Sequence, residues 1–134
     1  MSERSWINVT SLGDLIDRRA AEHPDREAVV FPDERYTYGE LAIRAQQVSK
    51  SLLGLGVGRG DRVGYFLHEC IDTLAVMLGA AKIGAITAPI NARFKPFELR
   101  QIVVHSGMKV VLTARPVGAT DFVGLIHETF PEIA

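Results

Sequence analysis

The sequence contains very little cysteine and no long apolar run. One cysteine among 134 residues excludes an internal disulfide framework and fits a reducing compartment. The longest apolar run, residues 74–81, is far too short to span a bilayer. Residues 1–6 have no long apolar segment behind their charges, so they are not typical of a secretory signal. We therefore expect a cytoplasmic protein with no transmembrane segment.

An excess of one charge and a metal-binding pattern are missing as well. The net charge is −1, so the sequence does not indicate a basic surface for nucleic acid. The four histidines show no His-x-x-x-His or Cys-x-x-Cys spacing, and we expect no metal site. Cys70 stands at the start of an apolar helical segment, which favours an inert core thiol over a nucleophile. The sequence identifies no catalytic residue.

A strand–helix–strand pattern occupies the middle of the chain. Residues 61–67 are rich in β-branched and aromatic side chains and predict a strand. Residues 70–83 are apolar on nearly every side, which is typical of a buried helix, and Gly84 follows where a left-handed residue ends a helix. Residues 85–90 predict a second strand. Short connections between such elements predict a βαβ unit with parallel strands and a right-handed crossover.

Helices and strands are also expected on both sides of this unit. Ser11 can cap the first helix, and Thr37 with Glu40 forms a capping box at the second. The second helix has one apolar stripe, made of Leu41, Ala45, Val48, Leu52 and Leu55. A further helix and strand continue the parallel sheet, which gives an α/β fold with a parallel βαβαβ sheet flanked by helices. The additional elements are expected at residues 11–23, 27–31, 35–37, 38–53, 96–107, 109–113 and 121–130.

The glycine-rich segment 54–60 invites a nucleotide-binding interpretation. A dinucleotide loop needs Gly-x-Gly-x-x-Gly after a strand and before a helix, so that helix amides face the phosphates. In this chain a helix precedes the segment and a strand follows it, and Arg59 stands where the third glycine would be. The pattern favours a helix end followed by a turn.

Four segments in the same order resemble the first part of the adenylate-forming superfamily, which includes acyl-CoA synthetases, adenylation domains and luciferases. The resemblance covers roughly residues 12–113. Asn91 stands where amino-acid-adenylating members usually carry aspartate, which favours the acyl-CoA synthetase branch. The segments are residues 36–41, 55–63, 81–91 and 106–111.

The resemblance implies a fold, a reaction and a set of cofactors. Residues 1–134 would be the N-terminal part of the large N-terminal domain of an acyl-CoA synthetase-like enzyme. The parent would join a fatty or related carboxylic acid to CoA through acyl-AMP, using ATP and Mg²⁺. The family's Ser/Thr/Gly-rich phosphate loop, its acidic ribose and magnesium ligands and its C-terminal lysine are not found in this chain. We therefore expect the chain alone to be inactive and to bind none of these cofactors.

Candidate ligand contacts follow the predicted parallel strands. Ligands of open parallel sheets gather beyond the carboxyl ends of the strands. The resemblance to CoA-bound relatives implies CoA-side contacts at Asn91, Arg93 and Arg115, because guanidinium groups pair well with phosphate oxygens. The alternative is that both arginines are solvated loop residues.

Three functional interpretations remain at this point. The first is an N-terminal fragment of an acid-CoA ligase, with its carboxylic acid held by the rest of the enzyme. The second, a separate nucleotide-binding module, is opposed by the reversed glycine segment. The third is a non-catalytic interaction or assembly domain derived from the same family. We also expect an isolated chain to be a homo-oligomer, associating through the outer face of the helix at residues 121–130, with Phe122 and Phe130, and through the edge of the strand that lacks a neighbour.

Overall fold

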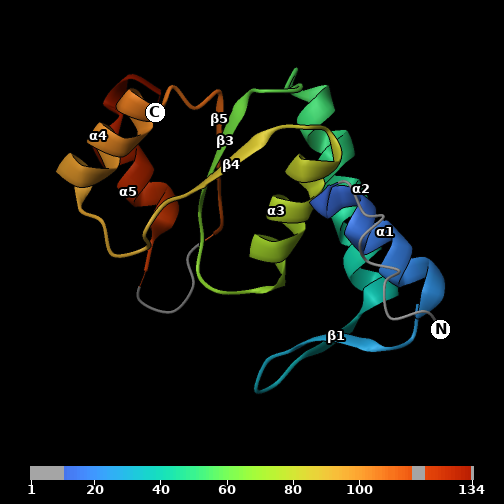
Figure 1. Ribbon diagram of the computed structural model, residues 1–134. Helices are drawn as coiled ribbons and strands as arrows, with labels where there is room; N and C mark the ends of the chain where they lie inside the picture. Colours follow the sequence, from blue (N-terminus) through green and yellow to red (C-terminus); the bar gives the residue numbers. More distant parts are fainter. Residues whose placement is uncertain (1–10, 116–119, 134) are drawn as a thin grey trace.

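The computed structural model describes residues 11–115 and 120–133, and its centre is a three-stranded parallel sheet. The strand order is β4-β3-β5. Helices α1, α2 and α3 lie on one side of the sheet, and α4 and α5 lie on the other (Figure 1). The parallel α/β fold flanked by helices is therefore confirmed. The strands are β3 (Arg62–Phe66), β4 (Ile86–Pro89) and β5 (Val110–Thr113).

The helices alternate with these strands along the chain, as the sequence predicts. An antiparallel hairpin of β1 (Glu27–Val30) and β2 (Arg35–Thr37) connects the first two helices and forms a separate small sheet. The helical elements are α1 (Leu12–Glu22), α2 (Tyr38–Gly54), α3 (Ile71–Lys82), α4 (Pro96–Ser106), α5 (Phe122–Thr129) and the short 3₁₀ helix η2 (Pro131–Ile133). None of the helices described has the length and apolar character that a bilayer-spanning segment needs.

The helix ends carry the signals that the sequence suggests. The Ser11 hydroxyl accepts a hydrogen bond from the Asp14 amide at 3.1 Å, which satisfies a free amide of the first turn of α1. Thr37 and Glu40 form the reciprocal capping box at the start of α2. Gly84 and Gly107 have φ angles of 71° and 60°, which suit glycine after a helix. Both capping predictions and both glycine stops are confirmed.

The glycine-rich segment between α2 and β3 is a turn. Gly56 and Gly60 have φ angles of 76° and 82°, and the Val57 amide donates to the Leu52 carbonyl at 2.9 Å. The Asp61 carboxylate then accepts hydrogen bonds from the Gly58 amide and the Lys109 ammonium group, both at 2.8 Å. The segment is thus used to end a helix and start a strand, which confirms its interpretation as a turn.

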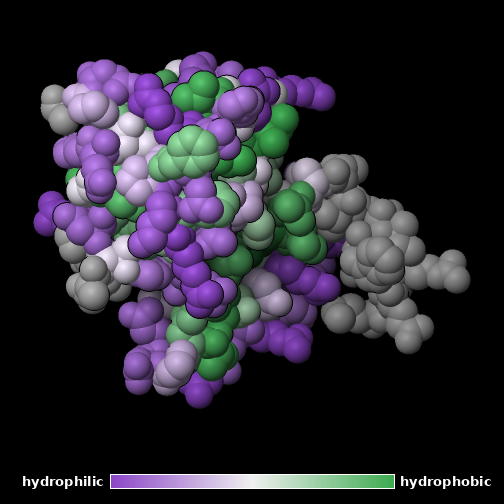
Figure 2. Space-filling view, turned by 90° about the vertical axis from the view of Figure 1, so that its left-hand side faces the viewer, coloured by the Kyte–Doolittle hydropathy of each residue, from purple (hydrophilic) through white to green (hydrophobic). Residues whose placement is uncertain are grey.

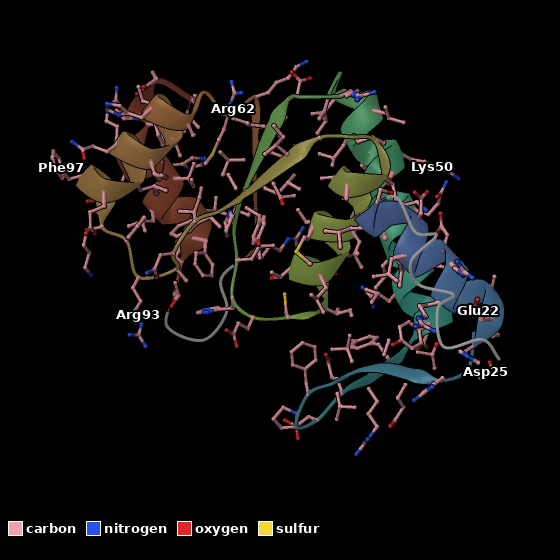
Figure 3. All side chains as sticks on the ribbon, in the orientation of Figure 1. Glu22, Asp25, Lys50, Arg62, Arg93 and Phe97 are labelled. Atoms are coloured by element: carbon pink, nitrogen blue, oxygen red, sulfur yellow. The ribbon has the colours of Figure 1, made fainter. Side chains whose placement is uncertain are left out.

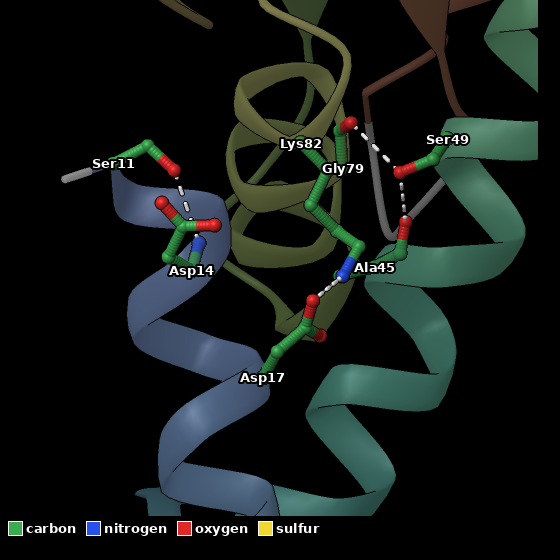
Figure 4. Close-up of polar contacts among 7 residues, drawn as sticks. All are labelled: Ser11, Asp14, Asp17, Ala45, Ser49, Gly79 and Lys82. Carbon is green, nitrogen blue, oxygen red and sulfur yellow. Dashed lines mark hydrogen bonds and ion pairs between the residues drawn. The ribbon is translucent and has the colours of Figure 1, made fainter. Parts of the chain in front are cut away.

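Helix α3 packs closely against its neighbours through small residues. A Cβ atom at Gly79 would lie 2.7 Å from the Ala45 carbonyl oxygen, so α2 and α3 approach with almost no side chain between them. The Ser49 hydroxyl lies 2.9 Å from the Ala45 carbonyl oxygen and 2.8 Å from that of Gly79, and it shares its proton between these acceptors (Figure 4). Three residues further along α3, at its C-terminal end, the Lys82 ammonium group pairs with Asp17 of α1. The expectation of a buried central helix is confirmed for half of its residues, which are Ile71, Ala75, Val76, Leu78, Gly79 and Ala80.

Large side chains fill the other face of the sheet. Phe66 of β3 and Phe122 of α5 meet edge to face, with ring centroids 4.8 Å apart. Leu99 of α4 completes this cluster, and all three side chains are fully buried. The outer surface of this half mixes hydrophilic and hydrophobic side chains (Figure 2). Phe97 of α4 is 73% exposed there.

Three side chains lie differently from the sequence-based expectation. Phe122 is fully buried and is not on an outer face of α5, because it packs against β3. Phe130 is half-buried beneath Arg100, whose guanidinium carbon lies 5.2 Å from the ring centroid. Leu55 is 59% exposed, because α2 ends at Gly54 and the helical stripe ends with it. The expected oligomer surface is therefore wrong at Phe122, while oligomerisation itself stays a prediction.

Candidate functional site

The carboxyl ends of the three parallel strands form one edge of the central sheet. β4 and β5 both pair with β3 in parallel register, so the loops that follow all three strands emerge at this edge. Helices α3 and α4 return against the strands and begin at the same edge, where the free amides of their first turns favour anions. The topology therefore brings the predicted residues to one side of the molecule.

The loop after β4 contains Asn91 and Arg93. The Asn91 side-chain oxygen accepts a hydrogen bond from the Arg93 amide at 3.0 Å, and the Asn91 carbonyl accepts one from the Phe94 amide at 3.0 Å. Asn91 therefore shapes the turn that presents Arg93, as asparagine commonly does. The Arg93 side chain points away from the sheet at this edge (Figure 3).

Arg115 lies on the loop after β5, on the other side of β3. The strands β4 and β5 that precede the two loops lie two strand spacings apart, which is roughly 10 Å. The guanidinium groups of Arg93 and Arg115 are both exposed, and neither has an ion-pair partner within residues 11–115 and 120–133. The structure places the two arginines at the same edge without direct contact.

The loop after β3 brings a histidine to the same edge. The His68 ring meets Phe122 of α5 edge to face, with ring centroids 4.7 Å apart. The Thr73 hydroxyl donates to the His68 carbonyl at 2.8 Å and ties this loop to the first turn of α3. Nothing in the sequence indicates the contact between His68 and Phe122, because it joins two segments that are distant along the chain.

Cys70 is the residue before α3 and is partly exposed, so it is not the core thiol that the sequence suggests. Its sulfur lies 3.8 Å from the Thr73 hydroxyl. The described contacts include none between Cys70 and a base that would activate the thiol. Within the described ranges, no group of three or more His, Cys, Asp or Glu side chains has the arrangement to hold a metal ion.

An ion pair between Asp61 and Lys109 lies at the opposite edge of the sheet. The hydrogen bond from Lys109 and that from the Gly58 amide hold the pKa of Asp61 below its ordinary value. Lys109 also donates to the Gly56 carbonyl at 2.6 Å. These contacts connect the start of β3 with the start of β5 and the preceding turn, so their role is structural.

The chain matches the sequence profile of the AMP-binding enzyme family over residues 16–132. That span covers most of the sequence, and the chain belongs to this family. The expected resemblance to the adenylate-forming enzymes is confirmed.

Curated relatives of the chain include several acyl-CoA ligases. It is 36% identical over 120 residues to the acyl-CoA ligase sidI of Beauveria bassiana, covering 88% of this chain and 21% of that protein. It is 34% identical over 108 residues to the long-chain-fatty-acid–CoA ligase FadD13 of Mycobacterium tuberculosis, covering 79% of this chain and 22% of the relative. The chain thus spans about a fifth of the length of these relatives.

Solved structures of related enzymes also resemble this chain. The N-terminal domain of FACL13 from Mycobacterium tuberculosis superposes with a TM-score of 0.76 at 28% identity, over 92% of this chain and 36% of that one. The anthranilate CoA ligase AuaEII in complex with anthranoyl-AMP gives a TM-score of 0.81 at 27% identity, over 92% of this chain and 23% of the ligase. The likeness therefore extends over nearly all of the present fold.

Proposed function

We propose that this chain is an N-terminal α/β portion of an ATP-dependent acid-CoA ligase. The observation that carries the proposal is the family match together with relatives that are acyl-CoA ligases and of which the chain spans about a fifth. In the complete ligase, a carboxylate oxygen attacks the α-phosphorus of ATP, which forms acyl-AMP and releases pyrophosphate. The CoA thiolate then attacks the acyl carbon, and AMP leaves. The substrate is a fatty acid or a related carboxylic acid.

We assign the residues that form acyl-AMP to the part of such a ligase that lies outside this chain. The described ranges offer no cluster of side chains for Mg²⁺, and the glycine-rich turn follows a helix and precedes a strand, which is the reverse of a phosphate-binding loop. We therefore propose that the chain by itself forms no acyl-AMP and binds neither ATP nor Mg²⁺. A cytoplasmic location is part of the same proposal.

The contribution of this chain is proposed to be a CoA-facing edge. Arg93 and Arg115 present exposed guanidinium groups at the carboxyl ends of β4 and β5, and Asn91 shapes the loop that carries Arg93. Two separated cations suit the separated phosphates of CoA. They would hold the nucleotide end of CoA while its thiol reaches the acyl-AMP.

The test is a chimera in which this chain replaces the matching segment of FadD13. Acyl-CoA formation and ATP–pyrophosphate exchange are measured for the chimera and for the chain alone. We expect activity only in the chimera. Exchange by a purified, contaminant-free sample of the chain alone would refute its proposed inactivity, and a folded but inactive chimera would argue against the proposed function.

The CoA contacts are tested in the same chimera. Arg93→Ala and Arg115→Ala should each raise the KM for CoA several-fold and leave ATP–pyrophosphate exchange unchanged, because exchange precedes CoA binding. The matched control is Arg26→Ala, an exposed arginine beside the β1–β2 hairpin. An unchanged KM for CoA in both variants would show that the two arginines are solvated loop residues that do not contact CoA.

A further inference from the structure

Helix α4 has apolar side chains on its outer face as well as on the face that it packs into the core. Leu99 is fully buried, whereas Phe97 and Val104 are 73% and 60% exposed. Phe97 and Val104 are seven residues apart, so they lie on one side of the helix, about 10 Å apart along its axis. Phe97 points away from the rest of the molecule (Figure 3). The described chain therefore leaves a second apolar surface of α4 in solvent.

A groove runs along the same helix beside Phe97 and Val104. It has a volume of about 430 Å³. Glu98 and His105 stand two helical turns apart along it, with an exposed Ile102 between them. The outer face of α4 thus has an apolar side and a side that carries an acidic and a basic group. The groove is lined by Phe94, Glu98, Gln101, Ile102 and His105.

Glu98 and His105 are each held by one contact within their own helix and keep one polar atom for another partner. The Lys95 amide donates to Oε2 of Glu98 at 2.9 Å, which leaves Oε1. Nδ1 of His105 donates to the Gln101 carbonyl at 2.9 Å, since a carbonyl oxygen can only accept, and this leaves Nε2. Within residues 11–115 and 120–133, neither side chain has an ion-pair partner.

The two sides of this outer face have nearly the same midpoint. The midpoint of Phe97 and Val104 and that of Glu98 and His105 fall on either side of Gln101, which is exposed. A two-fold axis through Gln101 that relates two antiparallel copies of α4 places each side of the helix against the same side of its copy, in the reverse direction. Phe97 of one copy then meets Val104 of the other, and Glu98 meets His105. Each contact occurs twice, as two-fold symmetry requires.

We propose that the outer face of α4 is a docking site for a second copy of this chain, with the two α4 helices antiparallel. The Glu98 carboxylate favours the protonated imidazole of the opposite His105, and the pair forms a charge-assisted hydrogen bond. The two Phe97–Val104 contacts remove apolar surface from water. This inference goes beyond the proposed function and does not rest on it, because it uses only α4 and the loop before it.

The expected dimer is weak. Each α4 helix has 11 residues, and a pair of them buries less than the roughly 1,200–2,000 Å² of a stable protein interface. We therefore expect a dissociation constant on the order of 100 µM. The chain is then a monomer at the low micromolar concentrations used to follow unfolding by circular dichroism.

The experiment is analytical ultracentrifugation of the full 134-residue chain at concentrations from well below to well above this dissociation constant. We expect the mass to rise from that of a monomer to that of a dimer and no further. Phe97→Ser should weaken the dimer about tenfold. Ile43→Ser is the matched control, since Ile43 is 62% exposed but lies on α2. Both positions are exposed, so both variants should keep the fold.

A cross-linking experiment tests the position of the two-fold axis. Gln101→Cys in a Cys70→Ser background should form a disulfide-linked dimer on mild oxidation, because the axis places the two sulfur atoms opposite each other. Ile43→Cys in the same background is the control for random collision and should form far less of the linked dimer.

A charge exchange tests the polar contact. Glu98→Lys should weaken the dimer, and the further change His105→Glu should restore it, because the opposite charges then meet in reversed order. Glu98 also accepts from the Lys95 amide, and loss of that helix cap would not be repaired by the second change. Restoration therefore distinguishes a contact between two copies from a structural role of Glu98.

The proposal would be overturned by a monomer mass at the highest concentration, by equal effects of Phe97→Ser and Ile43→Ser on dimerisation, or by equal cross-linking of the two cysteine variants. Binding of a monomer to phosphatidylglycerol vesicles that is lost in Phe97→Ser would assign this face to a lipid surface instead and would overturn it as well. These measurements involve no catalysis, so an inactive FadD13 chimera would contradict only the proposed function.

Discussion

The two faces of the central sheet are covered in different ways. On one face, α2 and α3 approach so closely that Gly79 leaves no space for a Cβ atom. On the other face, the rings of Phe66 and Phe122 fill the space between β3 and α5. The contact between α2 and α3 thus depends on a small residue, and the contact between α5 and β3 depends on large ones. The two faces should therefore be sensitive to opposite changes: the α4–α5 face to the loss of a large side chain, and the α2–α3 face to the addition of a small one.

Removal of a large side chain should have the largest effect, and it should occur on the α4–α5 face. Phe122→Ala is expected to lower the free energy of unfolding by about 3–5 kcal/mol, because Phe122 is fully buried between α5 and β3. Chemical denaturation monitored by circular dichroism measures this. Phe97→Ala on α4 is the control, since Phe97 is 73% exposed and its loss should cost almost nothing. Equal effects of the two changes on the free energy of unfolding would contradict this account of the α4–α5 face.

Addition of a single methyl group should damage the α2–α3 face. Gly79→Ala is expected to lower the free energy of unfolding by about 1–3 kcal/mol, because the new Cβ would lie 2.7 Å from a backbone carbonyl oxygen that cannot move away easily. Gly54→Ala at the end of α2 is the matched control. Its Cβ would meet nothing within 4 Å, and alanine should stabilise the helix by about 0.5–1 kcal/mol. The same sign for both changes in urea denaturation would contradict the packing argument.

A smaller effect is expected at the polar contact within the same interface. Ser49→Ala removes the hydroxyl that bonds to the Ala45 and Gly79 carbonyls and should cost about 1 kcal/mol. Ser51→Ala, two residues along α2 and exposed, is the control for helix propensity. Thermal melts of the two variants measure the difference. If Ser49→Ala and Ser51→Ala have the same melting temperature, close packing alone stabilises the α2–α3 interface.

The smallest effect should be independent of both faces, because the Asp61–Lys109 pair lies at the start of the strands that both faces share. The pKa of Asp61 is lowered in the folded chain, so the pair stabilises the fold above the ordinary value of 3.8. This stability is lost as the pH falls from 3.8 through the lowered folded pKa. Lys109→Met should therefore reduce stability at neutral pH, and the difference from the wild type should disappear in acid. Lys50→Met is the control, since the described part of the chain contains no ion pair to Lys50.

Local elements of the fold were predictable because their signals lie within a few residues. The capping box of Thr37 and Glu40 joins residues three positions apart, and Gly84 ends α3 directly after its last turn. The same holds for the turn at Gly56. The candidate site was partly predictable, since the rule for parallel sheets places Arg93 and Arg115 at the same edge once three parallel strands are expected.

The sequence by itself determined the helices, the strands and their parallel direction, because hydrophobic period, caps and connection lengths are local properties. Only the tertiary structure decided which side chains meet across the sheet. The sequence around Phe122 fits an exposed and a buried helix position equally well. The contact with Phe66 made Phe122 part of the core. Lys109 and Asp61 are 48 residues apart, and their ion pair exists because β5 lies beside β3. The exposure of Leu55 was decided in the same way, by the end of α2 at Gly54.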